Sequence, residues 1–132
     1  MPRSIVASAP GSAMLFGEHS VLRGGTAIVA AIDCRLSVRI SPRTDQVIEV
    51  HSSLGHTSTT CKDLSFGHAL RFIEGVFRLV RPEEGFFVEV ISSIDPTVGL
   101  ASSASVTVAL LAALRAYSVG SIDRQVLLND AC

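Results

Sequence analysis

The sequence predicts a single α+β domain, in which a mostly antiparallel sheet carries helices on one face. The strand-like segments come first in the chain, followed by a helix, one more strand and a second helix, which is an order typical of α+β domains. The 132 residues are enough to bury a real core. Hydrophobic residues make up 48% and charged residues 17% of the chain, a composition that favours a packed domain over disorder.

Alternating or short continuous apolar runs predict the strands. The predicted set covers residues 4–8, 14–16, 26–32, 36–40, 47–51 and 86–91. Clusters of Gly, Pro, Ser and Asp predict turns at residues 9–12, 23–25 and 41–45. The polar segment 52–62, rich in Ser and Thr, is interpreted as an irregular loop.

Two complete helices are predicted in the second half of the chain. Apolar residues recur at helical spacing over residues 66–80, with Arg and Glu side chains on the opposite face. Asp63 or Ser65 can cap this helix, and Pro82 ends it. Residues 102–117 are apolar nearly all round, which predicts a buried helix.

Charge and composition exclude several classes of partner. A net charge of −1, no Trp and a single Tyr argue against nucleic acid, and no apolar run is long enough to span a membrane. Three cysteines without a CxxC pair predict neither a disulfide framework nor a zinc site, so we expect a cytoplasmic protein. His51, His56 and His68 are interpreted as solvated or capping residues rather than as metal ligands.

The segment 95–105 joins a predicted strand to the predicted buried helix. Gly99 lets the backbone approach a ligand closely, and the small residues Ser102, Ser103 and Ala104 surround the start of the helix. The free N–H groups and the dipole of a helix N-terminus suit an anion. From these residues alone, a phosphate site and a simple cap by Ser102 both stay open.

A second segment, residues 9–25, places Glu18 and His19 in a mainly apolar stretch, directly after a glycine. A carboxylate beside an imidazole suits a ligand that bears hydroxyl groups. A solvated loop is the more common role for such a dipeptide, and the HExxH pattern of metalloproteases is absent.

The two segments together resemble the mevalonate kinases, in the superfamily that includes galactokinase, homoserine kinase and phosphomevalonate kinase. Residues 9–25 are similar to the motif A-P-G-K-x-x-L-x-G-E-H-x-V-x-x-G, and residues 96–104 are similar to P-x-G-x-G-L-G-S-S-A. Galactokinases continue from Glu-His into Thr-Asp, whereas Ser20 and Val21 follow here, which favours the mevalonate branch.

The resemblance implies ATP-dependent phosphorylation of a small-molecule hydroxyl, with mevalonate, a precursor in isoprenoid biosynthesis, as the expected substrate. It also implies a domain similar in fold to a domain of a ribosomal protein. Glu18 and His19 match substrate-site residues of the family, and Ser103 matches a magnesium ligand. The ATP phosphate loop of the family matches Pro96, Gly99, Leu100, Ala101, Ser102, Ser103 and Ala104.

Three positions depart from the family motifs. Ser12 stands where the family has a lysine beside the reacting hydroxyl, so the chain offers no matched catalytic residue. Val98 and Ala101 stand where glycines are usual or frequent, and a Cβ at residue 101 occupies space where the backbone approaches phosphate.

The resemblance covers residues 7 to about 117, and a further helix is predicted to begin at residue 121. The family's later magnesium-binding glutamate and its Gly-x-x-Ser-Gly-x-Asp motif do not occur within the chain. We therefore expect residues 1–132 to be an N-terminal ATP- and substrate-binding domain that is inactive alone and self-associates through uncovered apolar surface. A sibling kinase for another hydroxylated metabolite and a non-catalytic fragment remain alternatives.

Overall fold

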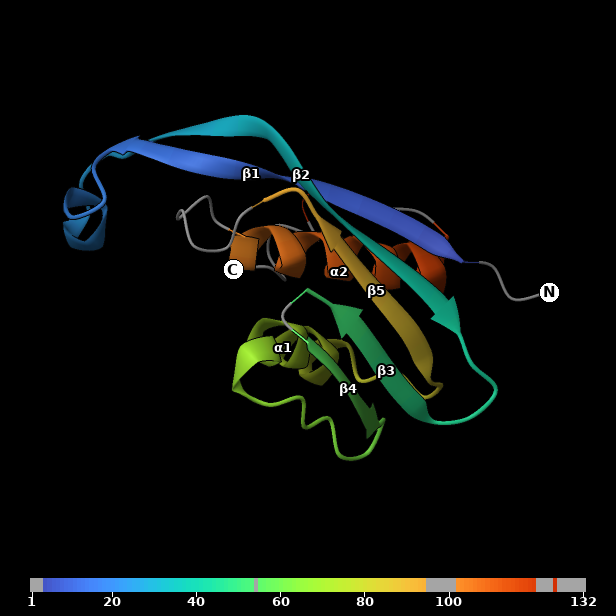
Figure 1. Cartoon of the computed structure of the whole chain (residues 1–132). Helices are drawn as coiled ribbons and strands as arrows, with labels where there is room; N and C mark the ends of the chain where they lie inside the picture. The colour runs from blue at the N-terminus through green and yellow to red at the C-terminus, as the bar shows by residue number, and fades with distance from the viewer. Residues whose placement is uncertain (1–3, 54, 95–101, 121–124, 126–132) are drawn as a thin grey trace.

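The computed structural model describes residues 4–53, 55–94, 102–120 and 125, which form a five-stranded sheet with two helices (Figure 1). The strands are β1 (Ile5–Phe16), β2 (Ile28–Pro42), β3 (Val47–Ser52), β4 (Gly55–Thr60) and β5 (Phe86–Ser92). The helices are α1 (Arg71–Val80) and α2 (Ser102–Val119), with short 3-10 turns η1 (Ser20–Arg23) and η2 (His68–Leu70). The predicted α+β class is confirmed.

The sheet has the strand order β1-β2-β5-β3-β4. Among the described strands, β1 with β2, β2 with β5 and β3 with β4 pair antiparallel, while β3 and β5 pair parallel. A parallel pair needs a long crossover connection, and the segment that carries β4, η2 and α1 provides it. The sheet is therefore mixed, with three antiparallel pairings and one parallel pairing.

The core lies between the sheet and the two helices. Val38, Val50 and Val88 come from three neighbouring strands and are fully buried, as is Phe77 of α1. All of residues 109–114 in α2 are buried too, which confirms the predicted buried helix. No helix within the described residues is long and apolar enough to cross a membrane.

The four strands predicted within residues 4–40 are two long strands, β1 and β2. The register of β1 against β2 shifts between Pro10 and Ser12 and again between Met14 and Phe16. The turn predicted at the first of these places is therefore wrong, because the extra residue is absorbed as a bulge within a continuous ladder. A proline is tolerated there because β1 is an edge strand.

Beyond the first bulge, β1 and β2 continue as a two-stranded arm (residues 12–31) that carries η1 at its end (Figure 1). The expected uncovered apolar surface is found here, while self-association stays a prediction. The exposed apolar side chains of the arm are Met14, Leu15, Phe16, Val21, Leu22, Ile28 and Val29.

Strand β4 lies within the segment that the sequence interpretation assigned to an irregular loop, so that interpretation was wrong. β4 pairs antiparallel with β3 along the edge of the sheet. Its β-branched residues Thr57 and Thr59 face the helices and are partly or fully buried, which suits a pleated strand despite their polarity.

Helix α1 begins at Arg71, later than predicted, and its N-cap residue is Leu70. Neither Asp63 nor Ser65 caps it, because the Ser65 hydroxyl donates to the Asp63 carboxylate at 3.1 Å in the preceding turn. The predicted end before Pro82 is confirmed, since the last helical residue is Val80.

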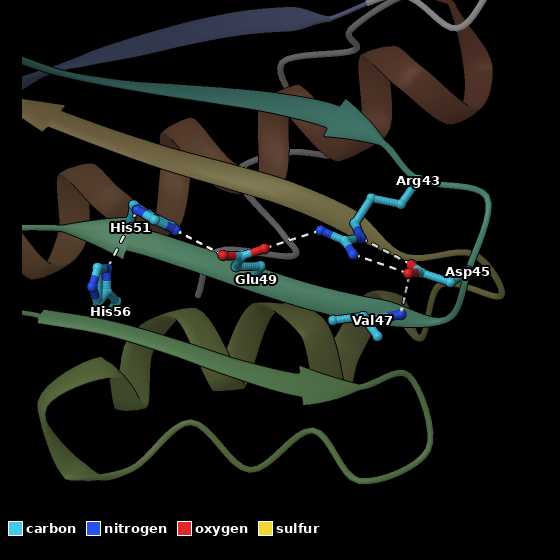
Figure 2. A network of polar contacts seen from close by, with 6 residues as sticks. All are labelled: Arg43, Asp45, Val47, Glu49, His51 and His56. Carbon is cyan, nitrogen blue, oxygen red and sulfur yellow. Dashed lines mark hydrogen bonds and ion pairs between the residues drawn. The ribbon is translucent and has the colours of Figure 1, made fainter.

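Charged groups hold the turn between β2 and β3 (Figure 2). Arg43 donates from Nε and Nη2 to the two carboxylate oxygens of Asp45, both at 2.9 Å, and from Nη1 to Glu49 at 3.0 Å. The backbone N–H of Val47 also donates to Asp45 at 3.2 Å. The hydrogen bonds from Arg43 and then from Val47 lower the pKa of Asp45 from 3.8 to about 2.

Asp45→Asn is expected to lower the thermal unfolding temperature at neutral pH, because the amide loses the charged contact with Arg43. A depressed carboxyl pKa in the folded state contributes stability above the unfolded pKa, here near 3.8, and this is lost as the pH falls through about 2. The difference in Tm between wild type and variant should therefore shrink across that window in thermal melts monitored by circular dichroism. Asp33→Asn, at an exposed position of β2, is the control, and an equal pH-dependent loss there would contradict the assignment.

Candidate functional site

Glu18 and His19 lie at the end of the β1–β2 arm, and both are exposed. Gly17 precedes them with φ of +94°, and a Cβ at this position would overlap the backbone oxygen of Thr26. Only glycine fits where the two strands of the arm approach so closely. In Figure 1 the arm projects beyond the end of α2 at which that helix begins.

Ser12 lies where the arm leaves the body of the sheet. It is half-buried on β1, opposite Ala31 of β2 and directly after the bulge. The structure thus separates the residues of the first segment, with Ser12 at the base of the arm and Glu18 and His19 at its end.

The second segment is described from Ser102 onward, where α2 begins. Ser102, Ser103 and Ala104 form the first turn of this 18-residue helix, whose leading N–H groups have no partner within the helix itself. Ser103 is half-buried and Ala104 is exposed. The remaining predicted phosphate-loop residues lie outside the described residues; they are Pro96, Gly99, Leu100 and Ala101.

A partly buried hydrogen bond joins the two segments. The hydroxyl of Ser105, which is 3% exposed, donates to the backbone carbonyl of Pro10 at 2.9 Å. Pro10 belongs to the β1 bulge next to Ser12, and Ser105 is one turn into α2. The bond therefore fixes the start of α2 against the base of the arm, although the two residues lie 95 positions apart in the sequence.

A cleft of about 350 Å³ opens beside the first turn of α2. Its polar rim includes Ser103 of α2, Arg71 of α1, and Ser52 and Ser53 at the end of β3. The apolar part of its lining comes from β2, η2, α1, β5, the segment that follows β5, and α2. It comprises Leu36, Ala69, Leu70, Phe72, Ile73, Val90, Ile94 and Val106. An apolar cleft with a few polar groups is the usual form of a small-molecule site.

Arg71 is exposed, as its place on the polar face of α1 predicts, but it also lines the candidate cleft, which sequence reasoning missed. Helical spacing places it on the polar face of α1, which predicts a solvated side chain. In the structure it lines both the cleft and a second groove of about 410 Å³ between α1 and α2, together with Ser103. Its guanidinium lies 4.7 Å from the centre of the Phe72 ring and donates to Nε2 of His68 at 3.0 Å. No periodicity signals this role, because it arises from the packing of α1 beside α2.

Both segments lie within residue ranges that match known protein families. Residues 68–131 match the family described as GHMP kinases N terminal domain. Residues 1–42 match the galactokinase galactose-binding signature, a range that contains Ser12, Glu18 and His19.

Individual relatives agree with these matches. A mevalonate kinase from Archaeoglobus fulgidus is 38% identical over 131 residues, which cover 96% of this chain and 43% of that protein. The crystal structure of the Methanococcus jannaschii mevalonate kinase superposes with a TM-score of 0.82 at 22% identity, covering 98% of this chain and 45% of that one. Lactococcus lactis galactokinase superposes with a TM-score of 0.80 at 20% identity, covering 98% of this chain and 36% of that one.

The two structural matches establish the fold, and the sequence matches show which family the chain resembles. The chain spans less than half the length of these relatives. It resembles the N-terminal domain of the GHMP kinases over residues 68–131, and 96% of its length is similar to a mevalonate kinase.

Proposed function

We propose that the full-length protein transfers the γ-phosphoryl group of ATP to a hydroxyl of mevalonate, a step in isoprenoid biosynthesis, and that residues 1–132 are its ATP- and substrate-binding domain. The observation that carries this proposal is the bond from Ser105 to Pro10, which joins the start of α2 to the segment of Ser12. The 38% identity to a mevalonate kinase supports the choice of substrate.

The phosphates of ATP would bind at the first turn of α2. This turn begins at Ser102, and its leading N–H groups have no acceptor within the helix itself; the small residues Ser103 and Ala104 suit the close approach of an anion. The guanidinium of Arg71 lines the same cleft as Ser103 and adds a fixed positive charge. In this proposal Pro96, Gly99, Leu100 and Ala101 complete the phosphate loop.

The nucleoside of ATP would occupy the cleft beside α1. Its apolar lining and volume of about 350 Å³ suit a planar base. Ser52 and Ser53 at the rim offer hydroxyl groups for hydrogen bonds to the base or the ribose. In this proposal Ser52 and Ser53, at the end of β3, contact the nucleotide.

In this proposal the hydroxyl of Ser103 is one oxygen ligand of a magnesium ion, and phosphate and water supply the others. Within the described part of the chain, no group of three or more His, Cys, Asp or Glu side chains could hold a metal ion. A magnesium ion bound chiefly by phosphate and water needs just one or two protein ligands, and a serine hydroxyl is one of the oxygens it accepts. When bound, magnesium would neutralise charge on the transferred phosphoryl group.

The acceptor substrate would bind along the arm, between Ser12 at its base and Glu18 and His19 at its end. Glu18 and His19 can hydrogen bond the hydroxyl or carboxylate groups of a small polar acid. Ser12 lies next to the bulge that α2 contacts, which suits a position near the reacting hydroxyl.

A sugar kinase is the second candidate function. The galactose-binding signature matches residues 1–42, which is the same part of the chain that we assign to the acceptor. The two candidates share ATP and the same cleft, and they differ in the acceptor alone.

We expect the full-length protein with ATP and magnesium to phosphorylate mevalonate with a higher kcat/KM than galactose or homoserine. The isolated 132-residue chain should show no turnover, because positioning and charge stabilisation by the whole site provide nearly all of the catalysis in phosphoryl transfer. A coupled assay for ADP release measures both. Ser103→Ala should reduce the magnesium-dependent rate, while Ser118→Ala, at an exposed site late in α2, should not.

Preference for galactose would replace the first function with the second. Turnover by the isolated chain would contradict the proposal that it is one part of a larger site, and an unchanged rate in Ser103→Ala would leave that residue as a helix cap.

Ser105→Ala should lower the stability of the protein by about 0.5–1.5 kcal/mol, because it removes the partly buried hydrogen bond to the Pro10 carbonyl. Since the bond aligns α2 with the base of the arm, kcat/KM should also fall several-fold in assays below the unfolding temperature. Thermal melts and steady-state kinetics measure the two effects. A loss of stability with full activity would show that the bond serves folding alone.

Ser12→Lys should raise the rate of phosphoryl transfer to mevalonate, because a lysine supplies a fixed positive charge where serine has a short neutral hydroxyl. Groups that stabilise charge in a transition state contribute about 10²–10³ in rate. Steady-state kinetics of wild type, Ser12→Lys and Ser12→Ala separate the effect of charge from that of the hydroxyl. A slower Ser12→Lys beside an efficient wild type would mean that the site is built around serine.

A further inference from the structure

Two histidines face each other on the side of the sheet opposite the helices (Figure 2). His51 of β3 and His56 of β4 are direct partners in the antiparallel register. Ile48 and Val50 of β3 are buried toward the helices, so the alternation of the strand turns His51 to the open face. Neither histidine lines the cleft.

The two rings meet through their Nδ1 atoms. Nδ1 of His51 lies 3.3 Å from Nδ1 of His56, and the ring centres are 4.4 Å apart at an interplanar angle of 69°. The ring of Phe87 on β5 packs against His51, with 4.9 Å between the ring centres. Strand pairing and this aromatic contact together fix where the His51 ring lies.

A carboxylate determines which ring nitrogen of neutral His51 carries the hydrogen. Nε2 of His51 lies 3.0 Å from Oε1 of Glu49, and a carboxylate can only accept, so Nε2 carries the hydrogen. In neutral His51 the lone pair is therefore on Nδ1, facing His56. Glu49 also accepts from Arg43, whose guanidinium is held by Asp45. Metal-binding histidines in proteins are commonly oriented in this way, with the second ring nitrogen donating to a carboxylate.

The distance between the two nitrogens matches the spacing of two ligands on a tetrahedral cation. With Zn–N bonds of about 2.0–2.1 Å and tetrahedral angles, two ligand nitrogens lie about 3.3–3.4 Å apart. The same bonds at right angles, as in square-planar sites, would require about 2.9 Å. The observed separation of 3.3 Å fits the tetrahedral case.

We propose that His51 and His56 bind a zinc ion through their Nδ1 atoms, with solvent water in the other two positions. Two protein ligands are fewer than a structural zinc site has, so the site is an exchangeable one. Without metal, Nδ1–H of His56 donates to Nδ1 of His51; in the zinc complex that proton is carried on the Nε2 of His56.

Charge and access favour a dication at this place. His56 is exposed, and the side chain of His51 is 39% exposed, so an ion and its waters can reach both rings. Three carboxylates lie on this part of the face, those of Asp45, Glu49 and Glu89, the last on β5 in register with His51. Of the nearby guanidinium groups, that of Arg43 is paired with Asp45 and Glu49, and Arg39 lies in register with Glu89.

Isothermal titration of the purified protein with zinc chloride should give saturable binding of one ion per chain. His51→Ala and His56→Ala should each weaken binding at least tenfold. Glu49→Gln should weaken it by about tenfold, near the lower end of the effect of second-shell partners. His68→Ala is the matched control, because Nε2 of this histidine accepts a hydrogen bond from Arg71, and its zinc affinity should equal that of wild type.

NMR of the wild-type protein gives a test that does not depend on the folding of the variants. Of the four histidines in the chain, the ring resonances of His51 and His56 should shift on addition of zinc, and those of His19 and His68 should not. Absence of saturable binding up to millimolar zinc, or a zinc affinity in His51→Ala and His56→Ala equal to that of wild type, would overturn the proposal. The result is independent of kinase activity, because the site and the cleft share no residue.

Discussion

The packing of α2 against strand β1 is the constraint on which the candidate site depends. Burial of residues 109–114 holds the helix to the sheet, but apolar contact is non-directional and sets neither the rotation of the helix nor its position along its axis. The hydroxyl of Ser105 supplies a direction, because its partly buried hydrogen bond to the Pro10 carbonyl forms in one alignment of the helix against β1. That alignment brings Ser103 to the rim of the cleft and Ser12 to the base of the arm.

Much of the fold is predictable because it follows from local patterns. The continuous apolar run of α2 and the alternation in β2, β3 and β5 each require burial of one face or of the whole element. The sequence interpretation was wrong where backbone pairing between strands outweighs the local conformational preference of the residues. Pro10 and Gly11 have turn chemistry, yet the ladder with β2 continues past them. The segment of β4 has few apolar residues, and β3 supplies the backbone partners that make it a strand.

The residues of the candidate site likewise fall into two groups, those that the sequence predicts and those that only the structure brings together. Ser12, Glu18, His19 and Ser103 stand within contiguous motifs, so the sequence alone identifies them. Arg71 and the serines after β3 reach the cleft because α1 packs beside α2 and the end of β3 lies near the start of α1. His51 and His56 pair across a hairpin that the sequence interpretation treated as a loop. Residues brought together by tertiary packing leave no signal in a single sequence.

The separation of 95 positions between Pro10 and Ser105 has a consequence for synthesis on the ribosome. The hairpins β1–β2 and β3–β4 join neighbours in the chain and can close early, whereas contacts between distant residues form late because loop closure costs entropy. Edge strand β1 therefore emerges roughly ninety codons before the helix that covers it, with its inward side chains exposed meanwhile. A nascent chain in that state offers both an open strand edge and an apolar face, which are the features that chaperones protect in partly made proteins.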